Sequence, residues 1–504
     1  MTDVADPQRS VVGSSNAGVR SKAAVVDRDW SVSPVMRPEA PFFETPPNPS
    51  ATRRMLLVFF YFAPSAEVGV LRWLSLAKFG AERGWAMDVV TLHPMHMGTL
   101  DNSRLAQLPN GVRLFGFSGE EPLWFRGLMS TWRRLNGTSS RNGGSGLDGH
   151  LDGSDTARVV MTPDAPEWRR SFRSQIHFRV ADVFARRAVS LGRALAAAQH
   201  YDVVVSSGPP HAAHLAAREI AATTGVPFVM DMRDPWSEDA AAPEELRSAA
   251  WQRITKVNED RCIASATSVV VTSEAHEELQ LRKYPFLRGR VRTVMNGADQ
   301  EAIPKSQLGN QFVVGFAGMI YLGRDPRVLF RAAAQVARET GATPEEFIVE
   351  FMGDDACNGV PLTVIAQEQG LGNHFKSHGF RPRREALAFL SRAALLVSLP
   401  LRTTMTLPAK LFEYTRFDAW LLALAEKGSA TEALLRGTGA DVVEPEDEAS
   451  IVRVLRTRYD AFRAGRRPVA LNHDGCFDRS TQSARMFGLL DEIAASPRGG
   501  ARGR

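Results

Sequence analysis

The fold is indicated most clearly by Leu407-Pro408-Ala409-Lys410-Leu411-Phe412-Glu413-Tyr414, which lies between two apolar segments at residues 395–399 and 420–424. A strand, a turn, a short helix that opens with proline and a second strand make one unit of a parallel α/β sheet. Ligands of such sheets bind beyond the carboxyl ends of the strands, where a helix turns free backbone N–H groups toward them. Lys410 and Glu413 are three residues apart and share one helical face, which suits a diphosphate and the hydroxyls of a ribose. An ordinary Lys–Glu pair on a crossover helix is the alternative.

Length and composition indicate a globular chain with more than one domain. The chain has 504 residues, of which 44% are hydrophobic and 23% charged, and this is more than a single core usually holds. Apolar runs stay shorter than the roughly 18 residues of a membrane span, so we expect no transmembrane helix. The net charge of +5 is too small to predict a nucleic-acid partner. Cys262, Cys357 and Cys476 are widely spaced, which predicts neither a disulfide framework nor a zinc site.

Three segments are expected to lie outside the folded domains or at their surface. Residues 1–50 lack the apolar stretch of a secretory signal and predict a flexible tail, so we expect a cytoplasmic protein. Residues 139–156 are dominated by Gly, Ser, Asp and Asn and predict a disordered insertion. The segment from Trp124 to Leu135 mixes large apolar and basic residues. It predicts either an interfacial helix at the inner face of a membrane or a helix that packs on the domain with its arginines in solvent.

Strand and helix patterns alternate along most of the remaining chain. The predicted strands lie at residues 55–60, 87–92, 201–206, 228–231, 268–272, 291–295, 312–317, 347–352, 395–399, 420–425 and 442–443. Longer helices are expected at residues 181–198, 211–223, 244–266, 451–462 and 480–494, whereas residues 94–170 break the alternation. The turn Asn296-Gly297 separates the two series. The fold class is therefore α/β, with two doubly wound Rossmann-like domains at residues 51–297 and 298–475 that face a central cleft, and a terminal helix and tail at 476–504.

Six short motifs follow one another at spacings suited to these domains. They are Gly69-Val70-Leu71-Arg72, Ser206-Ser207-Gly208-Pro209-Pro210-His211, Asp231-Met232-Arg233-Asp234-Pro235-Trp236, Asn296-Gly297-Ala298-Asp299, Gly318-Met319-Ile320-Tyr321-Leu322-Gly323-Arg324-Asp325-Pro326 and Pro408-Ala409-Lys410-Leu411-Phe412-Glu413-Tyr414. In this order they resemble the GT-B glycosyltransferases, in particular retaining glycosyltransferase family 4 and its capsule or exopolysaccharide members. The resemblance covers about residues 55–462. It implies a nucleotide-sugar donor held chiefly by the second domain and an acceptor that faces the first.

The resemblance implies donor-binding roles in the second domain. Glu413 matches the second glutamate of the family's E-x7-E motif, which typically meets the donor ribose, whereas Met405 occupies the position of the first. Arg324 and Lys410 are the candidates for the cations on the donor diphosphate, and Gly318 lets the backbone approach the phosphates. Fixed cations stabilise charge on the departing nucleotide, so neither a metal nor another cofactor is expected. For Arg324, an ion pair with the next residue at a helix start is the alternative.

The resemblance also implies a cleft-facing glycine and histidine in the first domain. Gly69 retains one of the family's paired glycines after the first strand, and Arg72 lies one helical turn later, facing either the cleft or solvent. His211 follows two prolines and is expected to point into the cleft as a catalytic residue, with helix capping or packing as the alternative. His214 lies three residues later, but a third metal ligand with suitable spacing is not evident, so we expect no metal site.

Asp231, Arg233 and Asp234 end a predicted strand and enter a loop, which is where chemistry collects in such sheets. Asp234 is expected to be catalytic by orienting an acceptor hydroxyl, and Arg233 to bind an acceptor phosphate. Asp231 is expected to line the same part of the cleft. The alternative for all three is an Arg–Asp network that ties the loop to its neighbours.

The sequence therefore predicts an enzyme that transfers a sugar from a nucleotide-diphosphate donor to a hydroxyl of a glycan or lipid-linked acceptor in cell-surface polysaccharide biosynthesis. Retention of configuration follows from the resemblance alone. Closure of the two domains is expected to exclude water from the donor. A nucleotide-sugar epimerase on the same scaffold is one alternative. A non-catalytic scaffold in a glycan-assembly complex is the other, motivated by Met405 and by Glu67-Val68 at the position of a paired glycine.

Overall fold

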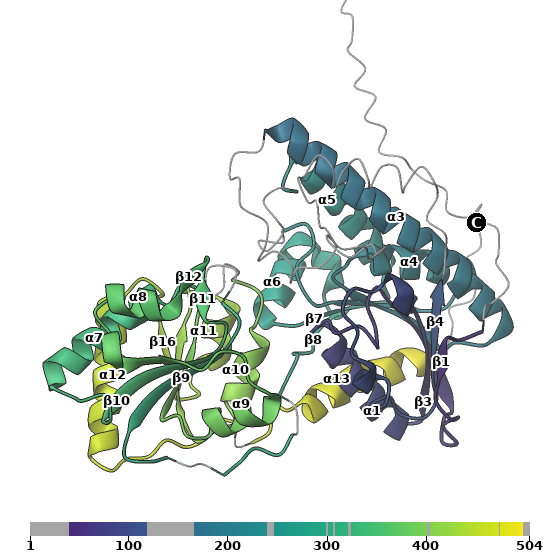
Figure 1. Cartoon of the computed structure of the whole chain (residues 1–504). Coiled ribbons are helices and arrows are strands. Elements are labelled where there is room, and N and C mark those ends of the chain that lie inside the picture. Colours follow the sequence, from purple (N-terminus) through teal and green to yellow (C-terminus); the bar gives the residue numbers. More distant parts are fainter. Residues whose placement is uncertain are drawn as a thin grey trace, which may run out of the picture.

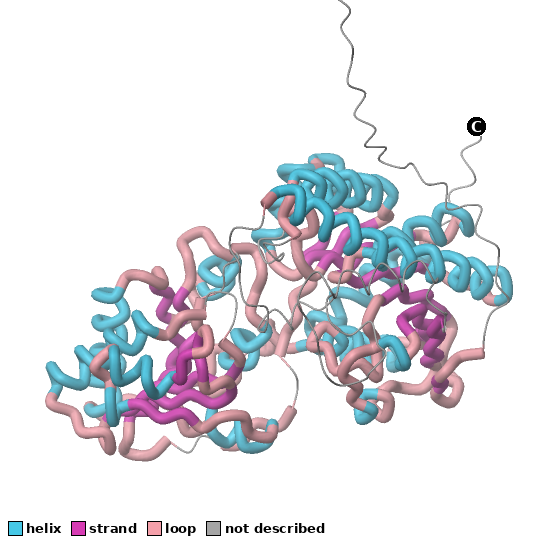
Figure 2. Tube along the Cα trace, turned by 45° about the horizontal axis from the view of Figure 1, so that its top comes forward, coloured by secondary structure: helices cyan, strands magenta, loops and turns pink. Residues whose placement is uncertain are grey.

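The computed structural model describes residues 40–117, 166–238, 246–298, 301–305, 308–320, 324–400, 404–472 and 474–496. These residues form two lobes, each built on one large β-sheet (Figure 1). The strands lie in the middle of each lobe and the helices outside them (Figure 2). This is the predicted α/β class with two doubly wound domains. The expected insertion at 139–156 and the segment from Trp124 to Leu135 lie outside the described residues.

The first lobe holds eight described strands in the order β1-β4-β3-β2-β5-β6-β7-β8. They are β1 (Phe43–Glu44), β2 (Arg53–Phe59), β3 (Trp85–Leu92), β4 (Val112–Phe117), β5 (Val203–Gly208), β6 (Phe228–Met232), β7 (Ser268–Val271) and β8 (Val291–Thr293). Neighbouring strands run parallel from β4 to β8, and β1 pairs antiparallel with β4. The helices are α1 (Val70–Glu82), α3 (Glu167–Ala198), α4 (Ala212–Thr224), α5 (Ala249–Ser265) and α6 (Glu274–Lys283), with short turns η2 (Pro94–His96), η3 (Asn102–Arg104) and η5 (Pro285–Leu287).

Strand β2 shows why the sequence of this lobe reads as continuous apolar runs. Leu56 and Val58 point into the core beneath α3 and α4, whereas Met55 and Leu57 point into the core beneath α1 and the last helix of the chain. All four side chains are buried. Because helices cover both faces of the sheet, neither face of the strand needs polar residues.

Three features of this lobe differ from the sequence prediction. Residues 40–50, predicted as part of a flexible tail, are placed, because Phe43 pairs with Leu114 and apolar side chains there pack on the core. Strand β4 was missed, since polar Arg113 and Gly116 interrupt its apolar run. Helix α3 begins 14 residues before the predicted helix at residue 181, because arginines are interspersed with the apolar residues of its first half and hide a regular apolar face.

The second lobe holds six described strands in the order β13-β10-β9-β14-β15-β16, all parallel. They are β9 (Phe312–Gly318), β10 (Phe347–Gly353), β13 (Phe375–Ser377), β14 (Leu395–Ser398), β15 (Trp420–Leu424) and β16 (Asp441–Val443), with a small hairpin of β11 (Ala356–Cys357) and β12 (Val360–Pro361). Helices α7 (Arg327–Thr340), α8 (Leu362–Glu368) and α12 (Glu448–Arg463) cover one face. Helices α9 (Arg383–Leu390), α10 (Ala409–Tyr414) and α11 (Ala430–Leu435) cover the other, and η6 (Gly372–His374) precedes β13.

The last helix, α13 (Arg479–Ala495), returns to the first lobe and packs beside α1. Phe487 lies against Gly80 of α1, and Asp491 accepts a hydrogen bond from Trp85 Nε1 at 3.0 Å and pairs with Arg83 at 2.6 Å. The chain therefore crosses between the lobes after β8 and again before α13. None of the described helices combines the length and the apolar character that crossing a bilayer would require.

Each sheet has one point where the strand order reverses. It lies between β2 and β5 in the first lobe and between β9 and β14 in the second. At such a point the connections on the two sides diverge and leave a crevice beyond the carboxyl ends of the strands. These two crevices are therefore the expected places for the predicted site residues.

Candidate active site

In the second lobe, Lys410 of α10 lies directly against Gly318 at the end of β9. Its Nζ donates a hydrogen bond to the carbonyl oxygen of Ala317, and a Cβ placed on Gly318 would overlap the lysine side chain. Gly318 also has a φ of 154°, which L side chains rarely adopt. Glycine is therefore required here for two reasons, and it brings the ammonium group to the strand end.

Arg324 supplies a second cation at the same strand end. It is 7% exposed, and its Nη1 donates to the carbonyl oxygen of Met319 at 2.8 Å. Asp325, its partner in the alternative ion pair at the start of α7, pairs with Arg327 at 2.6 Å. Burial, reinforced by the neighbouring Arg324 and Arg383 guanidinium groups, lowers the pKa of Lys410 to about 8. The positive charges are therefore close enough to act on one anion.

Glu413 lies one helical turn after Lys410 and forms an ion pair with Arg383 at the start of α9. Arg383 also pairs with Glu301 at 3.0 Å. The charge of Glu413 acts on Lys410, so the two residues belong to one electrostatic cluster, although the ion-pair partner of Glu413 is Arg383. Arg383 was missed in the sequence, because 30 residues separate it from Glu413. The four predicted donor-binding residues, Gly318, Arg324, Lys410 and Glu413, thus lie together.

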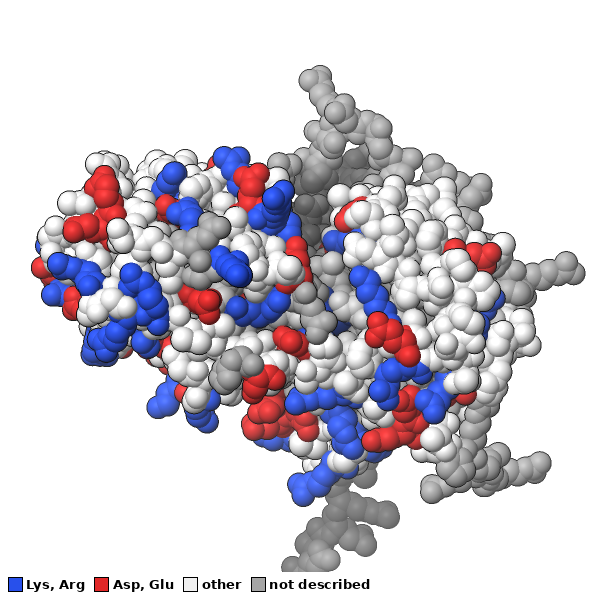
Figure 3. All heavy atoms as spheres, turned by 90° about the horizontal axis from the view of Figure 1, so that it is seen from below, with Lys and Arg blue, Asp and Glu red and all other residues white. Residues whose placement is uncertain are grey.

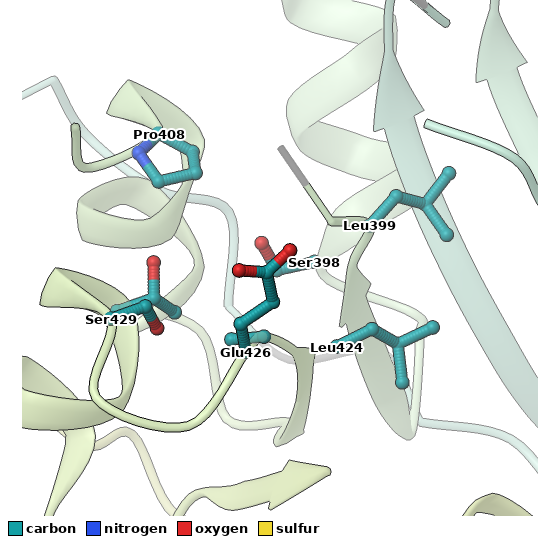
Figure 4. Close-up of a pocket in the computed structure, with 8 residues that line it drawn as sticks. Ser398, Leu399, Pro408, Leu424, Glu426 and Ser429 are labelled. Carbon is teal, nitrogen blue, oxygen red and sulfur yellow. The ribbon is translucent and has the colours of Figure 1, made fainter. Parts of the chain in front are cut away.

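A small pocket, open to solvent, lies beside the start of α10 (Figure 4). It is lined by Ser398, Leu399, Pro408, Leu424, Ala425, Glu426, Ser429 and Thr431. In Figure 4 the Glu426 side chain extends toward Ser398. The pocket contains none of the cations described above, so we locate the candidate donor site by the charged residues rather than by this cavity.

In the first lobe, Gly69 and Arg233 meet at the reversal point of the sheet. A Cβ on Gly69 would overlap the Arg233 guanidinium, which also donates to the carbonyl oxygen of Pro209 and lies 5.1 Å from the ring centre of Phe59. Because Gly69 has no side chain, the Arg233 guanidinium can occupy this position. The arginine thus connects the loops after β2, β5 and β6. This agrees with the alternative that Arg233 ties its loop to neighbouring segments.

The sequence suggested that Arg72 faces either the cleft or solvent. In the structure the side chain is instead 6% exposed and bound to Asp231. Its Nε and Nη2 donate to the Asp231 carboxylate at 3.2 and 3.0 Å, and Trp73 Nε1 and Ser207 Oγ donate to it at 2.9 Å each. Burial by itself raises the pKa of Asp231, but Arg72 and these donors outweigh it and lower the pKa. A buried charge must be paired in this way. The pair therefore fixes α1 to β6 instead of lining the cleft surface.

Arg72 also reaches the segment that links the lobes. Its Nη1 donates to the carbonyl oxygen of Met295 at 3.0 Å and to Asn296 Oδ1 at 3.3 Å. The Asp231–Arg72 pair is thus connected to the turn Asn296-Gly297. Sequence reasoning missed Trp73 and Ser207, since both are ordinary residues of an amphipathic helix and a buried strand.

His211 stands just before α4, and its ring stacks on Trp236 with 4.8 Å between ring centres and 15° between planes. Both ring nitrogens are buried and have no hydrogen-bond partner within the described part of the chain. Burial, with help from His214 and Arg233, holds the pKa of His211 well below its ordinary value. The imidazole is therefore neutral near pH 7 and can exchange one hydrogen bond in each direction with a bound molecule.

Asp234 lies where the two lobes meet. Its Oδ1 accepts a hydrogen bond from Thr406 Oγ1 of the second lobe at 3.4 Å, and burial raises the pKa of its carboxyl. Nearby, Ser273 Oγ donates to the carbonyl oxygen of Met405 at 2.6 Å. The loop before α10 therefore contacts the loops after β6 and β7. On the face drawn in Figure 3, basic side chains lie on both sides of the boundary between the lobes.

This chain is similar in sequence to one curated glycosyltransferase and similar in fold to several solved structures. D-inositol 3-phosphate glycosyltransferase 1 of Catenulispora acidiphila is 29% identical over 328 residues, which are 59% of this chain and 74% of that protein. Among solved structures, sucrose-phosphate synthase from Thermosynechococcus elongatus matches with a TM-score of 0.57 at 15% identity, over 88% of this chain and 100% of that one. The chain is a glycosyltransferase with the GT-B fold. No protein-family model matches the sequence.

A glycosyltransferase from Rickettsia africae has the same architecture, with a TM-score of 0.54 at 10% identity over 88% of this chain and 100% of that one. At such identities the solved structures establish the fold of this GT-B glycosyltransferase. Glycosyl transfer and the GT-B fold, both predicted from the sequence, are thereby confirmed.

Proposed function

We propose that this glycosyltransferase moves a sugar from a nucleotide-diphosphate donor to a hydroxyl of a glycan or lipid-linked acceptor, with retention of configuration, in cell-surface polysaccharide biosynthesis. One observation carries the proposal. Lys410 and Arg324 converge on the end of β9, with Glu413 on the same face of α10 as Lys410. Two cations beside one carboxylate match the chemistry of a diphosphate joined to a ribose.

In this proposal the second lobe stabilises the leaving group. Cleavage of the glycosidic bond leaves extra negative charge on the nucleotide diphosphate, and positive groups fixed in advance lower the barrier because they need not reorganise. Lys410 is fixed by Gly318 and Ala317, and Arg324 by Met319. Glu413, held by Arg383, would accept hydrogen bonds from the ribose hydroxyls.

The first lobe would receive the sugar and the acceptor. His211 supports this, since a neutral imidazole with two unpartnered buried nitrogens suits hydroxyl groups better than it suits phosphate. Asp234 would orient the acceptor hydroxyl, and its bond to Thr406 supports a place in the same crevice. Arg233 is committed to Pro209 and Phe59, so we propose that it positions the loop rather than binding an acceptor phosphate.

Release of nucleoside diphosphate tests the proposal. The purified protein is incubated with UDP-, GDP- and ADP-sugars, each with and without a lipid-linked glycan fraction or D-inositol 3-phosphate, the compound named in its relative from Catenulispora acidiphila. We expect one donor to release nucleotide only when an acceptor is present, and Lys410→Gln to reduce that release. Sugar isomerisation without nucleotide release would instead indicate an epimerase. Failure of every donor to bind would indicate a non-catalytic scaffold.

A further inference from the structure

Helix α3 exposes two large aromatic side chains near its N-terminus. Trp168 is 65% exposed and Phe172 is 44% exposed. Four residues separate them, so they lie on one face of the helix. Farther along the helix the opposite face is anchored in the lobe, because Phe184, Ala188 and Leu195 are buried. Figure 1 shows α3 along the outside of the first lobe. Large exposed aromatic groups on one face indicate a surface that meets another apolar or interfacial partner.

The same outward stripe continues as a row of arginines. Arg179 and Arg186 are exposed and follow Trp168 by 11 and 18 residues, which returns to the same face at 3.6 residues per turn. Along its whole length α3 carries seven arginines against two acidic residues, Glu167 and Asp182. Arg169 lies over the Trp168 ring at 5.2 Å. The stripe therefore joins aromatic groups to a net positive charge.

We propose that this stripe of α3 docks the first lobe on an anionic lipid surface. Tryptophan and phenylalanine settle among headgroups and upper acyl chains, while arginines bind lipid phosphates. The charge of the stripe is complementary to such a surface, and α3 would lie flat on it because its other face is part of the protein core. The aromatic pair provides the apolar contact and the arginine row provides the electrostatic attraction.

This docking is independent of the proposed reaction, because it concerns the outer side of α3 and is measured without turnover. It has a consequence for that reaction all the same. The lobe that we propose to face the acceptor would rest on the surface from which lipid-linked glycans project. The membrane contact predicted for the segment from Trp124 to Leu135 is a separate matter, since that segment lies outside the described residues.

Co-sedimentation with vesicles tests the proposal. The full chain is mixed with vesicles of phosphatidylcholine alone or with vesicles that also contain roughly 30% phosphatidylglycerol, which makes their surface anionic. We expect binding to the anionic vesicles that weakens with added salt. Arg179→Gln with Arg186→Gln should weaken it by roughly 25-fold, since each basic residue near such a surface contributes a factor of about five. Trp168→Ser with Phe172→Ser should weaken it by about tenfold or more.

Val469→Ser is the matched control, because Val469 is 72% exposed on the second lobe and its change should leave vesicle binding unaltered. Thermal unfolding of each variant checks that the lobe remains folded. Two results would overturn the proposal. One is equal binding of the wild type and the Trp168→Ser/Phe172→Ser variant to anionic vesicles, or no binding by either. The other is a dimer of the wild type that this variant converts to a monomer, which would assign the stripe to contact between two copies.

Discussion

Replacing Lys410 by glutamine should remove one of the two cations on which the proposed donor site depends. The side chain keeps much of its length but loses its charge, so the fold should survive and the phosphate contact should not. A hydrogen bond to a charged group contributes about 2 kcal/mol, so we expect donor affinity to fall roughly thirtyfold. Titration calorimetry with the best donor measures this directly. Lys376→Gln on β13 is the control, because Lys376 is exposed and far from this strand end in sequence.

The same residue gives the wild type a characteristic pH dependence. Burial lowers the pKa of Lys410 to about 8, and a bound diphosphate favours the charged form. Donor binding should therefore be constant below pH 7 and weaken as the pH rises through 8. With a pKa of about 8, the loss of affinity is about twofold at pH 8 and about tenfold at pH 9. Lys410→Gln should abolish this alkaline decline, and a decline that persists in the variant would refute the reasoning.

Three further predictions follow from the packing around the two crevices. Gly318→Ala should lower the free energy of unfolding by about 1–3 kcal/mol in urea titrations and weaken donor binding, because the methyl group meets the lysine side chain at a strained φ. Asp231→Ala should destabilise the protein by about 3–5 kcal/mol in the same assay, since it leaves Arg72 buried and unpaired, and Asp231→Ala with Arg72→Met should recover part of the loss. Trp236→Leu should expose His211 and raise its pKa toward 6.5, so that the pH profile of turnover declines more steeply below about pH 6.5 than that of the wild type.

Most of the fold could be read from the sequence because the strands are covered on both faces. Continuous apolar runs such as Leu56–Val58 and Leu395–Val397 then mark each strand, and glycine or proline marks its end. The prediction failed where this signal is weak. β4 has polar Arg113 and a glycine within six residues, and the first half of α3 hides its buried side chains among arginines.

The candidate site was predictable to the extent that its residues follow strand ends. Lys410, Glu413 and Arg324 each lie shortly after a buried strand, and the parallel sheet collects them at one edge. Their partners were not predictable. Arg383 belongs to another helix, and only the folded structure brings it next to Glu413. Arg72 was misassigned for a related reason, since nothing in the local sequence reveals that Asp231 would meet it 159 residues away.

Calorimetric titration of Glu413→Ala measures whether the second lobe binds a nucleotide sugar at the end of β9. The wild type, this variant and the control Glu368→Ala, which removes an exposed carboxylate at the end of α8, are titrated with a panel of nucleotide-diphosphate sugars. We expect at least one donor to bind the wild type and the control equally and the Glu413→Ala variant at least tenfold more weakly, as for the loss of a charged hydrogen-bond acceptor. Equal affinity in all three proteins, or no binding to any of them, would contradict the account.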